Sequence, residues 1–192
     1  MTSQTTTLAD YRRRESANRL GLWLFILSDA FMFGGLYVSR FYLLGTDTRP
    51  EVSQILGFVV TVVLLASSFF MNRAETAMAH GDQKAFLRGT LITLVLGVIF
   101  LVGVVGVEWQ VAPFGPGDGA AASLFYTMTG WHAFHVLTGV IFLAVVYNNG
   151  RKGMYTAERH WAVEASAVYW HFIDVVWIFF YPALYLIGKP LL

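Results

Sequence analysis

Residues 87–107 read LRGTLITLVLGVIFLVGVVGV, a run in which Arg88 carries the only charged side chain. The hydrocarbon layer of a membrane is about 30 Å thick, and a helix of about 20 apolar residues spans it. Four other apolar stretches of similar length occur in the chain, at residues 20–44, 52–71, 124–147 and 162–188. The sequence therefore predicts an all-α integral membrane bundle of five transmembrane helices.

The composition agrees with a membrane protein and excludes several kinds of site. Of the 192 residues, 56% are hydrophobic and 13% are charged, which is about half the charged share of a typical soluble domain. The sequence has no cysteine, so disulfides, thiolate metal sites, c-type haem attachment and a cysteine nucleophile are excluded. A formal net charge of +1 gives no reason to expect nucleic-acid binding. Lipid is the first expected partner.

The polar joints between the apolar stretches are too short to be domains. They lie at residues 45–51, 72–84, 113–119 and 148–158. We expect residues 1–16 to be a polar cytoplasmic segment, because they contain the arginine run 12–14 and lack the apolar core of a signal peptide. Residues 17–192 are expected to form a single transmembrane domain, in which short joints place successive helices antiparallel.

The basic residues predict how the helices are oriented in the membrane. Lysine and arginine are retained on the cytoplasmic side. In a five-helix arrangement, ten of them fall on the side of the N-terminus and only Arg40, Arg49 and Lys189 fall on the opposite side. We therefore expect the N-terminus in the cytoplasm and the C-terminus outside.

Asp29 lies in the middle of the first apolar stretch, with no basic residue within a helical turn. An ionisable group at membrane depth is costly, and a low dielectric favours the neutral form of an isolated carboxyl group. Two interpretations remain open for Asp29. It is either a neutral group hydrogen-bonded across a helix interface, or an acid that handles protons or contacts a partner.

Two polar stripes occur on the fourth and fifth helices. His132 and His135 share a face of the fourth helix, and Glu164, His171 and Asp174 share a stripe of the fifth. We expect the stripes to meet as an interhelical polar network. A di-metal site is the sharper alternative, but such sites use a Glu-x-x-His spacing that these residues lack. Opposed histidines could also bind haem, and spacing alone does not separate that from hydrogen bonding.

The residues near the helix ends have a plainer interpretation. We expect Glu108, at the end of the third helix, to reach water at the outer interface. Aromatic residues are typical of the membrane–water boundary and of lipid-contacting surfaces. The aromatic residues assigned to these surfaces are Trp109, Trp161, Trp170, Trp177, Tyr181 and Tyr185.

Three segments resemble one family, subunit III of the haem-copper oxidases. Residues 164–177, EASAVYWHFIDVVW, closely resemble a long and specific family motif with Glu followed by Tyr-Trp-His-Phe-Val-Asp-Val-Val-Trp. Residues 129–139, TGWHAFHVLTG, and residues 20–33, LGLWLFILSDAFMF, look like two further family segments. His160 also matches a family histidine. The resemblance spans all five helices and is to the short five-helix bacterial form.

The chain departs from the family pattern in two ways. Asp29 stands where the family has a glutamate that is one methylene longer, so its contacts are expected to be shifted or bridged by water. Seven-helix members have two additional N-terminal helices, separated from the rest by a lipid-filled cleft. A five-helix chain cannot build that cleft alone.

The resemblance implies a non-catalytic subunit of a proton-pumping terminal oxidase, which reduces oxygen to water in aerobic respiration. It implies haem and copper in subunits I and II, none in this chain, and a bacterial inner membrane as the location. This chain would stabilise subunit I, support proton uptake and accommodate bound phospholipid. It would contribute no catalytic residue, cofactor ligand or metal ligand. The expected buried polar, structural or proton-related residues are Asp29, His132, His135, His160, Glu164, Trp170, His171 and Asp174.

Two other functions stay open. A subunit-III-like accessory protein of a nitric oxide reductase shares the short form, and neither composition nor motif separates the two. A stand-alone proton-coupled carrier would use Asp29, Glu164 and Asp174 as its relay. Against a carrier, no helix is interrupted by paired glycine and proline at mid-membrane, and the sequence shows no internal repeat.

Overall fold

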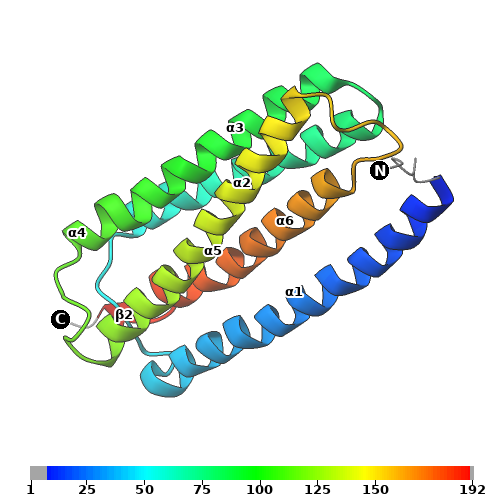
Figure 1. The fold of residues 1–192 in the computed structure, drawn as a ribbon. Coiled ribbons are helices and arrows are strands. Elements are labelled where there is room, and N and C mark those ends of the chain that lie inside the picture. The colour runs from blue at the N-terminus through cyan, green and yellow to red at the C-terminus, as the bar shows by residue number, and fades with distance from the viewer. Residues whose placement is uncertain (1–7, 191–192) are drawn as a thin grey trace.

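The computed structural model describes residues 8–190, which are mostly helical (Figure 1). Five helical rods are long and apolar enough to cross a membrane, which confirms the predicted all-α membrane bundle. Two of the rods contain π-helical turns: η1 joins α3 to the short α4, and η2 follows α6. In chain order the elements are α1 (Leu8–Leu44), β1 (Thr48–Arg49), α2 (Gln54–Ala79), α3 (Gln83–Leu101), η1 (Val102–Glu108), α4 (Trp109–Val111), α5 (Ala120–Arg151), α6 (Trp161–Tyr181), η2 (Pro182–Leu186) and β2 (Lys189–Pro190).

The helices extend beyond the apolar stretches in the sequence. α1 begins at Leu8, so residues 8–16 of the predicted polar segment are helical, whereas residues 1–7 lie outside the described part of the chain. Hydropathy marks only the part of a helix that lipid would cover. Outside the lipid-covered part, the helix can continue through polar residues, because their side chains are in water and are not buried.

Side-chain caps begin the helices after the short loops, and a glycine allows the tight turn between α2 and α3. Ser53 accepts a hydrogen bond from the backbone N–H of Leu56 at the start of α2, and Asp82 caps α3 through the N–H of Ala85. Gly81, immediately before Asp82, has a φ of +76°, a conformation that glycine adopts without steric cost. α2 and α3 therefore fold back on each other and pack along their length (Figure 1).

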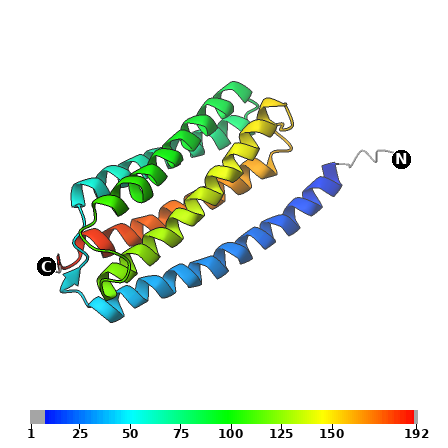
Figure 2. The same ribbon diagram turned by 60° about the vertical axis from the view of Figure 1, so that its left-hand side comes forward.

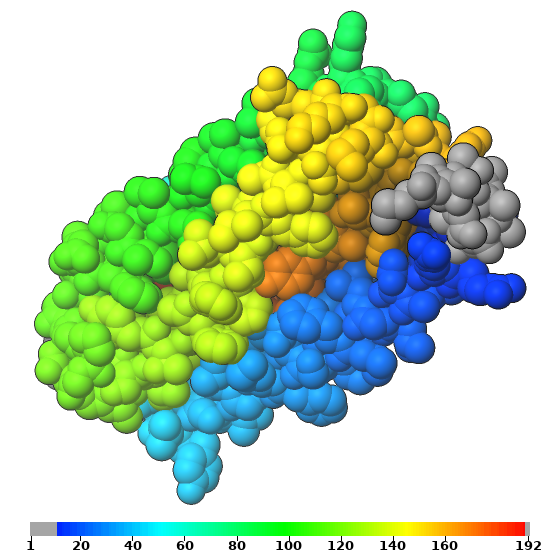
Figure 3. Space-filling model, viewed as in Figure 1, coloured from blue at the N-terminus to red at the C-terminus, as the bar shows by residue number. Residues whose placement is uncertain are grey.

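α1 is the most peripheral of the five long helices. Its main helix contacts are with α5 and α6, and its N-terminal end diverges from the bundle in Figure 2. In the space-filling view, α6 is visible at the base of a hollow between α5 and α1 (Figure 3). The ends of the described chain lie at opposite ends of the bundle, as an odd number of spans requires (Figure 1).

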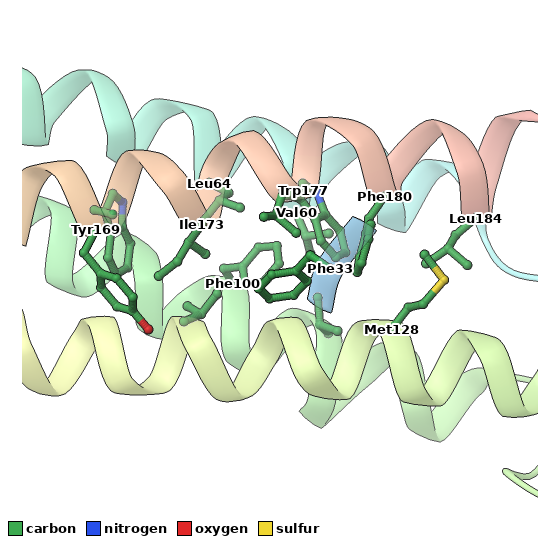
Figure 4. Packing of buried hydrophobic residues seen from close by; sticks show 14 of the residues in the cluster. Phe33, Val60, Leu64, Phe100, Met128, Tyr169, Ile173, Trp177, Phe180 and Leu184 are labelled. Atoms are coloured by element: carbon green, nitrogen blue, oxygen red, sulfur yellow. The ribbon is translucent and has the colours of Figure 1, made fainter. Parts of the chain in front are cut away.

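The core is built from aromatic and aliphatic side chains of all five long helices (Figure 4). Trp170 of α6 is fully buried. It fits because Gly97 of α3 and Gly139 of α5 leave room for its ring, and a methyl group at either position would press against the indole. Close approach over glycine is a common way for membrane helices to associate.

Candidate functional site

A carboxyl–imidazole pair joins α1 to α5 near the middle of both helices. Asp29 Oδ2 lies 3.1 Å from His135 Nε2, and both side chains are buried. His135 Nδ1 is 2.9 Å from the Trp131 carbonyl oxygen, which can only accept, so Nδ1 carries a proton. The contact with Asp29 then requires one more proton, held by the acid or by Nε2. The pair is therefore neutral overall in either arrangement.

Aromatic rings enclose this pair. Phe33 approaches the His135 ring edge-on with 4.8 Å between the ring centroids, and Trp131 lies 5.3 Å away. Figure 4 shows Phe33 within the packed core. Low polarity around the pair strengthens its hydrogen bond and makes separation of the two groups costly.

Glu164 forms a second link, between α1 and the beginning of α6. Arg19 Nη2 donates to Glu164 Oε2 at 2.6 Å, and His160 Nε2 lies 3.2 Å from Oε1. Arg19 also pairs with Glu15 at 2.7 Å, and its guanidinium lies over the Trp161 ring. The Glu164 side chain is only 22% exposed, whereas that of Arg19 is 51% exposed. This cluster lies at the end of the bundle where α1 diverges.

His132 contacts the backbone of α6. Its Nε2 donates to the Ile173 carbonyl oxygen at 3.1 Å, and its Nδ1 is buried without a hydrogen-bond partner among the described residues. The ring is fully buried against Trp177, with 4.7 Å between centroids. This environment suits a neutral imidazole that fastens α5 to α6.

The polar residues of α6 pair with hydroxyl groups of α2. Trp170 Nε1 donates to Ser67 Oγ at 2.9 Å, and Ser68 Oγ lies 2.6 Å from His171 Nδ1. At the next turns, Trp177 Nε1 donates to Thr61 Oγ1 at 2.9 Å. These α2 hydroxyl groups were not predicted from the sequence, since they carry no charge that would mark them at membrane depth. Their spacing on one face of an otherwise apolar helix was the available signal.

The expected meeting of the two stripes is wrong. His132 uses a backbone carbonyl of α6 and His135 turns to Asp29 of α1, while His171 turns to Ser68 of α2. Helical residues three apart differ by about 60° in direction, which is enough to aim two neighbouring histidines at different helices. The polar groups form several separate links and not one network.

Two expectations about the helix ends are also corrected. Glu108 is 1% exposed and does not reach water, because Tyr185 of η2 donates to its Oε2 at 2.7 Å. The two π-helical turns bring these side chains together. Trp170 and Trp177 are core residues and not interfacial ones, and Tyr185 is likewise fully buried.

Arg40 is a residue that the sequence analysis treated only as a topology signal. Its side chain is fully buried and donates to four backbone carbonyl groups. The Nε–O distance to Ala183 is 2.6 Å and the Nη1–O distance to Gly45 is 2.5 Å. Nη2 donates to Thr48 at 2.8 Å and to Ile187 at 2.9 Å. Arg40 thus ties α1 to the end of α6–η2 and to the β1–β2 pair.

The described residues contain no group of three or more histidine, aspartate or glutamate side chains placed to bind a metal ion. His132 contacts α6, His135 and Glu164 contact α1, and His171 and Asp174 face α2, so these side chains do not converge on one point. The arrangement therefore suits fastening of helices and the holding of single protons, and it offers no ligand set around a common point.

Similarity to known proteins extends along nearly the whole chain. The family described as cytochrome c oxidase subunit III matches residues 12–189. Cytochrome c oxidase subunit 3 of Thermostichus vulcanus is 34% identical over 176 aligned positions, covering 88% of this chain and 87% of the relative. The Podospora anserina protein of the same name is 36% identical, with 97% of this chain and 74% of the relative aligned. The Bos taurus protein is 35% identical, with 89% of this chain and 70% of the relative aligned. With this coverage, the chain belongs to the cytochrome c oxidase subunit III family.

Proposed function

We propose that this chain is the non-catalytic third subunit of a bacterial terminal oxidase, bound in the inner membrane to subunits I and II. As a member of its family, it is a multi-pass membrane subunit of a cytochrome c oxidase complex. The haems and copper would belong to the partner subunits, so this chain would contribute packing and support for proton uptake. The family match over residues 12–189 is the observation that carries the proposal.

The internal contacts support a structural role for the polar residues. Asp29 and His135 link α1 to α5, and Glu164 and Arg19 link α1 to α6. Lipid tails are as apolar as leucine, so membrane helices depend on packing and polar contacts to associate. We therefore propose that these residues hold the bundle in the shape that subunit I recognises.

We further propose that phospholipid binds along the chain. An apolar groove of about 290 Å³ lies between α1 and α6, lined by aromatic and small residues that include Phe33, Gly34, Tyr37 and Phe179. A groove of this composition suits an acyl chain, which makes dispersion contacts without hydrogen bonds.

The proposed orientation places the N-terminus in the cytoplasm. The loops that join α2 to α3 and α5 to α6 lie at the same end of the bundle as the N-terminal part of α1 (Figure 1). Together with the N-terminal part of α1, these loops and their flanks carry ten of the thirteen basic residues of the chain, which supports a cytoplasmic location for that end.

Purification in mild detergent from native membranes tests the proposal. The tagged full-length chain should retain a large multi-span subunit, and the mixture should show haem and copper. Membranes without the tag serve as the control. If the chain is recovered with the catalytic subunit of a nitric oxide reductase, the oxidase assignment is wrong. If it is recovered alone, a stand-alone carrier becomes the better explanation.

A further inference from the structure

A polar cluster lies on α2 and α6 at the depth where a membrane is most apolar. Ser68 is near the middle of the α2 span, and His171 and Asp174 are near the middle of the span formed by α6 and η2. His171 Nδ1 lies 2.6 Å from Ser68 Oγ and 3.9 Å from Asp174 Oδ2. We refer to these three residues as the mid-span cluster.

Asp174 is the inner member of the mid-span cluster. Its side chain is 4% exposed. The Ser68 hydroxyl faces it, but neither carboxyl oxygen has a hydrogen bond of good geometry from residues 8–190. A buried acceptor without a donor is costly. The Ser68 hydroxyl lies next to both Asp174 and His171, so the protonation of Asp174 decides toward which of them the hydroxyl proton is directed.

His171 is the outer member and has an open ring nitrogen. Its side chain is 35% exposed, and Ser68 occupies Nδ1. Within the described part of the chain, Nε2 makes no hydrogen bond. If Nδ1 accepts from Ser68, Nε2 carries a proton to donate. If Nδ1 donates to Ser68, Nε2 is an acceptor, or a donor when the ring is charged. In every case, Nε2 needs a partner from outside residues 8–190.

Lipid cannot provide that partner, because hydrocarbon has no hydrogen-bonding group. The exposed neighbours on this face are large and apolar. Leu65 precedes Ser68 by one turn of α2, and Val175 and Ile178 follow His171 by one and two turns of α6. Apolar side chains around one central polar group are typical of packed membrane helices, whereas polar and charged linings are typical of water-filled cavities.

We propose that the α2–α6 face is the docking surface for a transmembrane helix of another oxidase subunit, which places a hydroxyl or carboxamide side chain against His171 Nε2. Such a side chain both donates and accepts, so it satisfies Nε2 in either tautomer. Leu65, Val175 and Ile178 would pack around the contact. This inference rests on the proposed function, which supplies the partner subunits.

Site-specific photocrosslinking in the intact complex tests the docking surface. A benzophenone side chain at Ile178, which is 48% exposed and lies outside the lining of the α1–α6 groove, should capture a second subunit. Ile99 of α3 provides the matched control, because it is the same residue type, is also 48% exposed and lies near the middle of its span. We expect several-fold less capture from Ile99. Capture of only lipid or a second copy of this chain at Ile178 would overturn the inference, as would equal capture at both positions.

Substitutions at His171 test the hydrogen bond itself. His171→Phe keeps an aromatic ring without nitrogen and should weaken retention of the subunit in detergent by about 3- to 18-fold, the range measured for one interhelical hydrogen bond. His171→Gln should retain the subunit. Ser68→Ala removes only the internal contact and should also retain it. If Ser68→Ala weakens retention as much as His171→Phe, the effect is internal and the docking contact is refuted.

Failure of this inference differs from failure of the proposed function. If no other subunit copurifies with the unaltered chain, the proposed function is wrong and the docking surface with it. If the complex is intact but a benzophenone at Ile178 captures no other subunit, only the docking surface is wrong.

Discussion

Replacing Arg40 by lysine tests how the C-terminal end of the bundle is held together. The guanidinium spreads its donors over three nitrogen atoms and reaches four carbonyl groups, those of Gly45, Thr48, Ala183 and Ile187. A lysine ammonium keeps the positive charge but donates from a single atom. Its three N–H groups start from one point, which cannot lie within hydrogen-bond distance of carbonyl groups spread around a guanidinium, and we expect about two of the four to lose their donor.

The expected cost follows from the carbonyl groups that lose their donor. Each buried acceptor left without a partner costs roughly 1 to 3 kcal/mol. Two of them give about 2 to 6 kcal/mol if the effects add. The bond to Ala183 is buried and those to Gly45, Thr48 and Ile187 are part-buried, so water can replace some of the lost donors and we expect the lower part of this range.

Equilibrium unfolding of the purified protein in mixed micelles, with increasing sodium dodecyl sulfate, measures this difference. Arg73→Lys is the matched control, because Arg73 is exposed and lies over the Phe69 ring, 5.8 Å from its centroid. We expect that control to change the free energy of unfolding by less than about 0.5 kcal/mol. An Arg40→Lys protein as stable as the control variant would refute the role assigned to the guanidinium.

Three further predictions concern the polar links and the topology. Glu164→Gln should keep the subunit bound, because the amide still accepts a hydrogen bond from Arg19. Glu164→Leu should promote loss of the subunit from the complex and a faster decline of oxidase activity during turnover. Immediate loss of proton-coupled activity in an intact Glu164→Gln complex would instead identify Glu164 as a proton carrier. Asp29→Asn can still donate a hydrogen bond to His135 and should be as stable as the unaltered protein. Asp29→Leu should lower the free energy of unfolding by about 1 to 3 kcal/mol in the same assay. Equal stabilities of the two variants would contradict the role given to this hydrogen bond. Reporters fused near Gly153 and Gly117 should report the cytoplasm and the outside respectively, and an outside signal at Gly153 would overturn the proposed orientation.

The five spans could be predicted from sequence because their signal is local. Each span is a continuous apolar run, and the length of that run is set by membrane thickness. Helix ends were harder to predict, since α1 continues to Leu8 through polar residues that hydropathy does not assign to a membrane. The motif at residues 164–177 identified the family for a similar reason, because it too is a continuous stretch of sequence.

The polar contacts could not be predicted because they join residues that are distant in sequence. Glu108 in η1 and Tyr185 in η2 are 77 residues apart in the sequence, and only the folded bundle brings them within hydrogen-bond distance. Arg40 binds carbonyl groups, which every residue has and no sequence pattern marks. The direction of His132 and His135 depends on helix rotation, which a spacing of three residues does not determine.

The fate of haem when this chain is removed from the complex tests the central claim most directly. The complex is purified in mild detergent, the chain is released with a stronger one, and reduced-minus-oxidised spectra are recorded for both fractions. We expect all haem absorbance to remain with the other subunits and none with the released chain. Haem absorbance in the released chain, or its absence from the intact complex, would contradict the assignment of this chain as a non-catalytic subunit of a haem-copper oxidase.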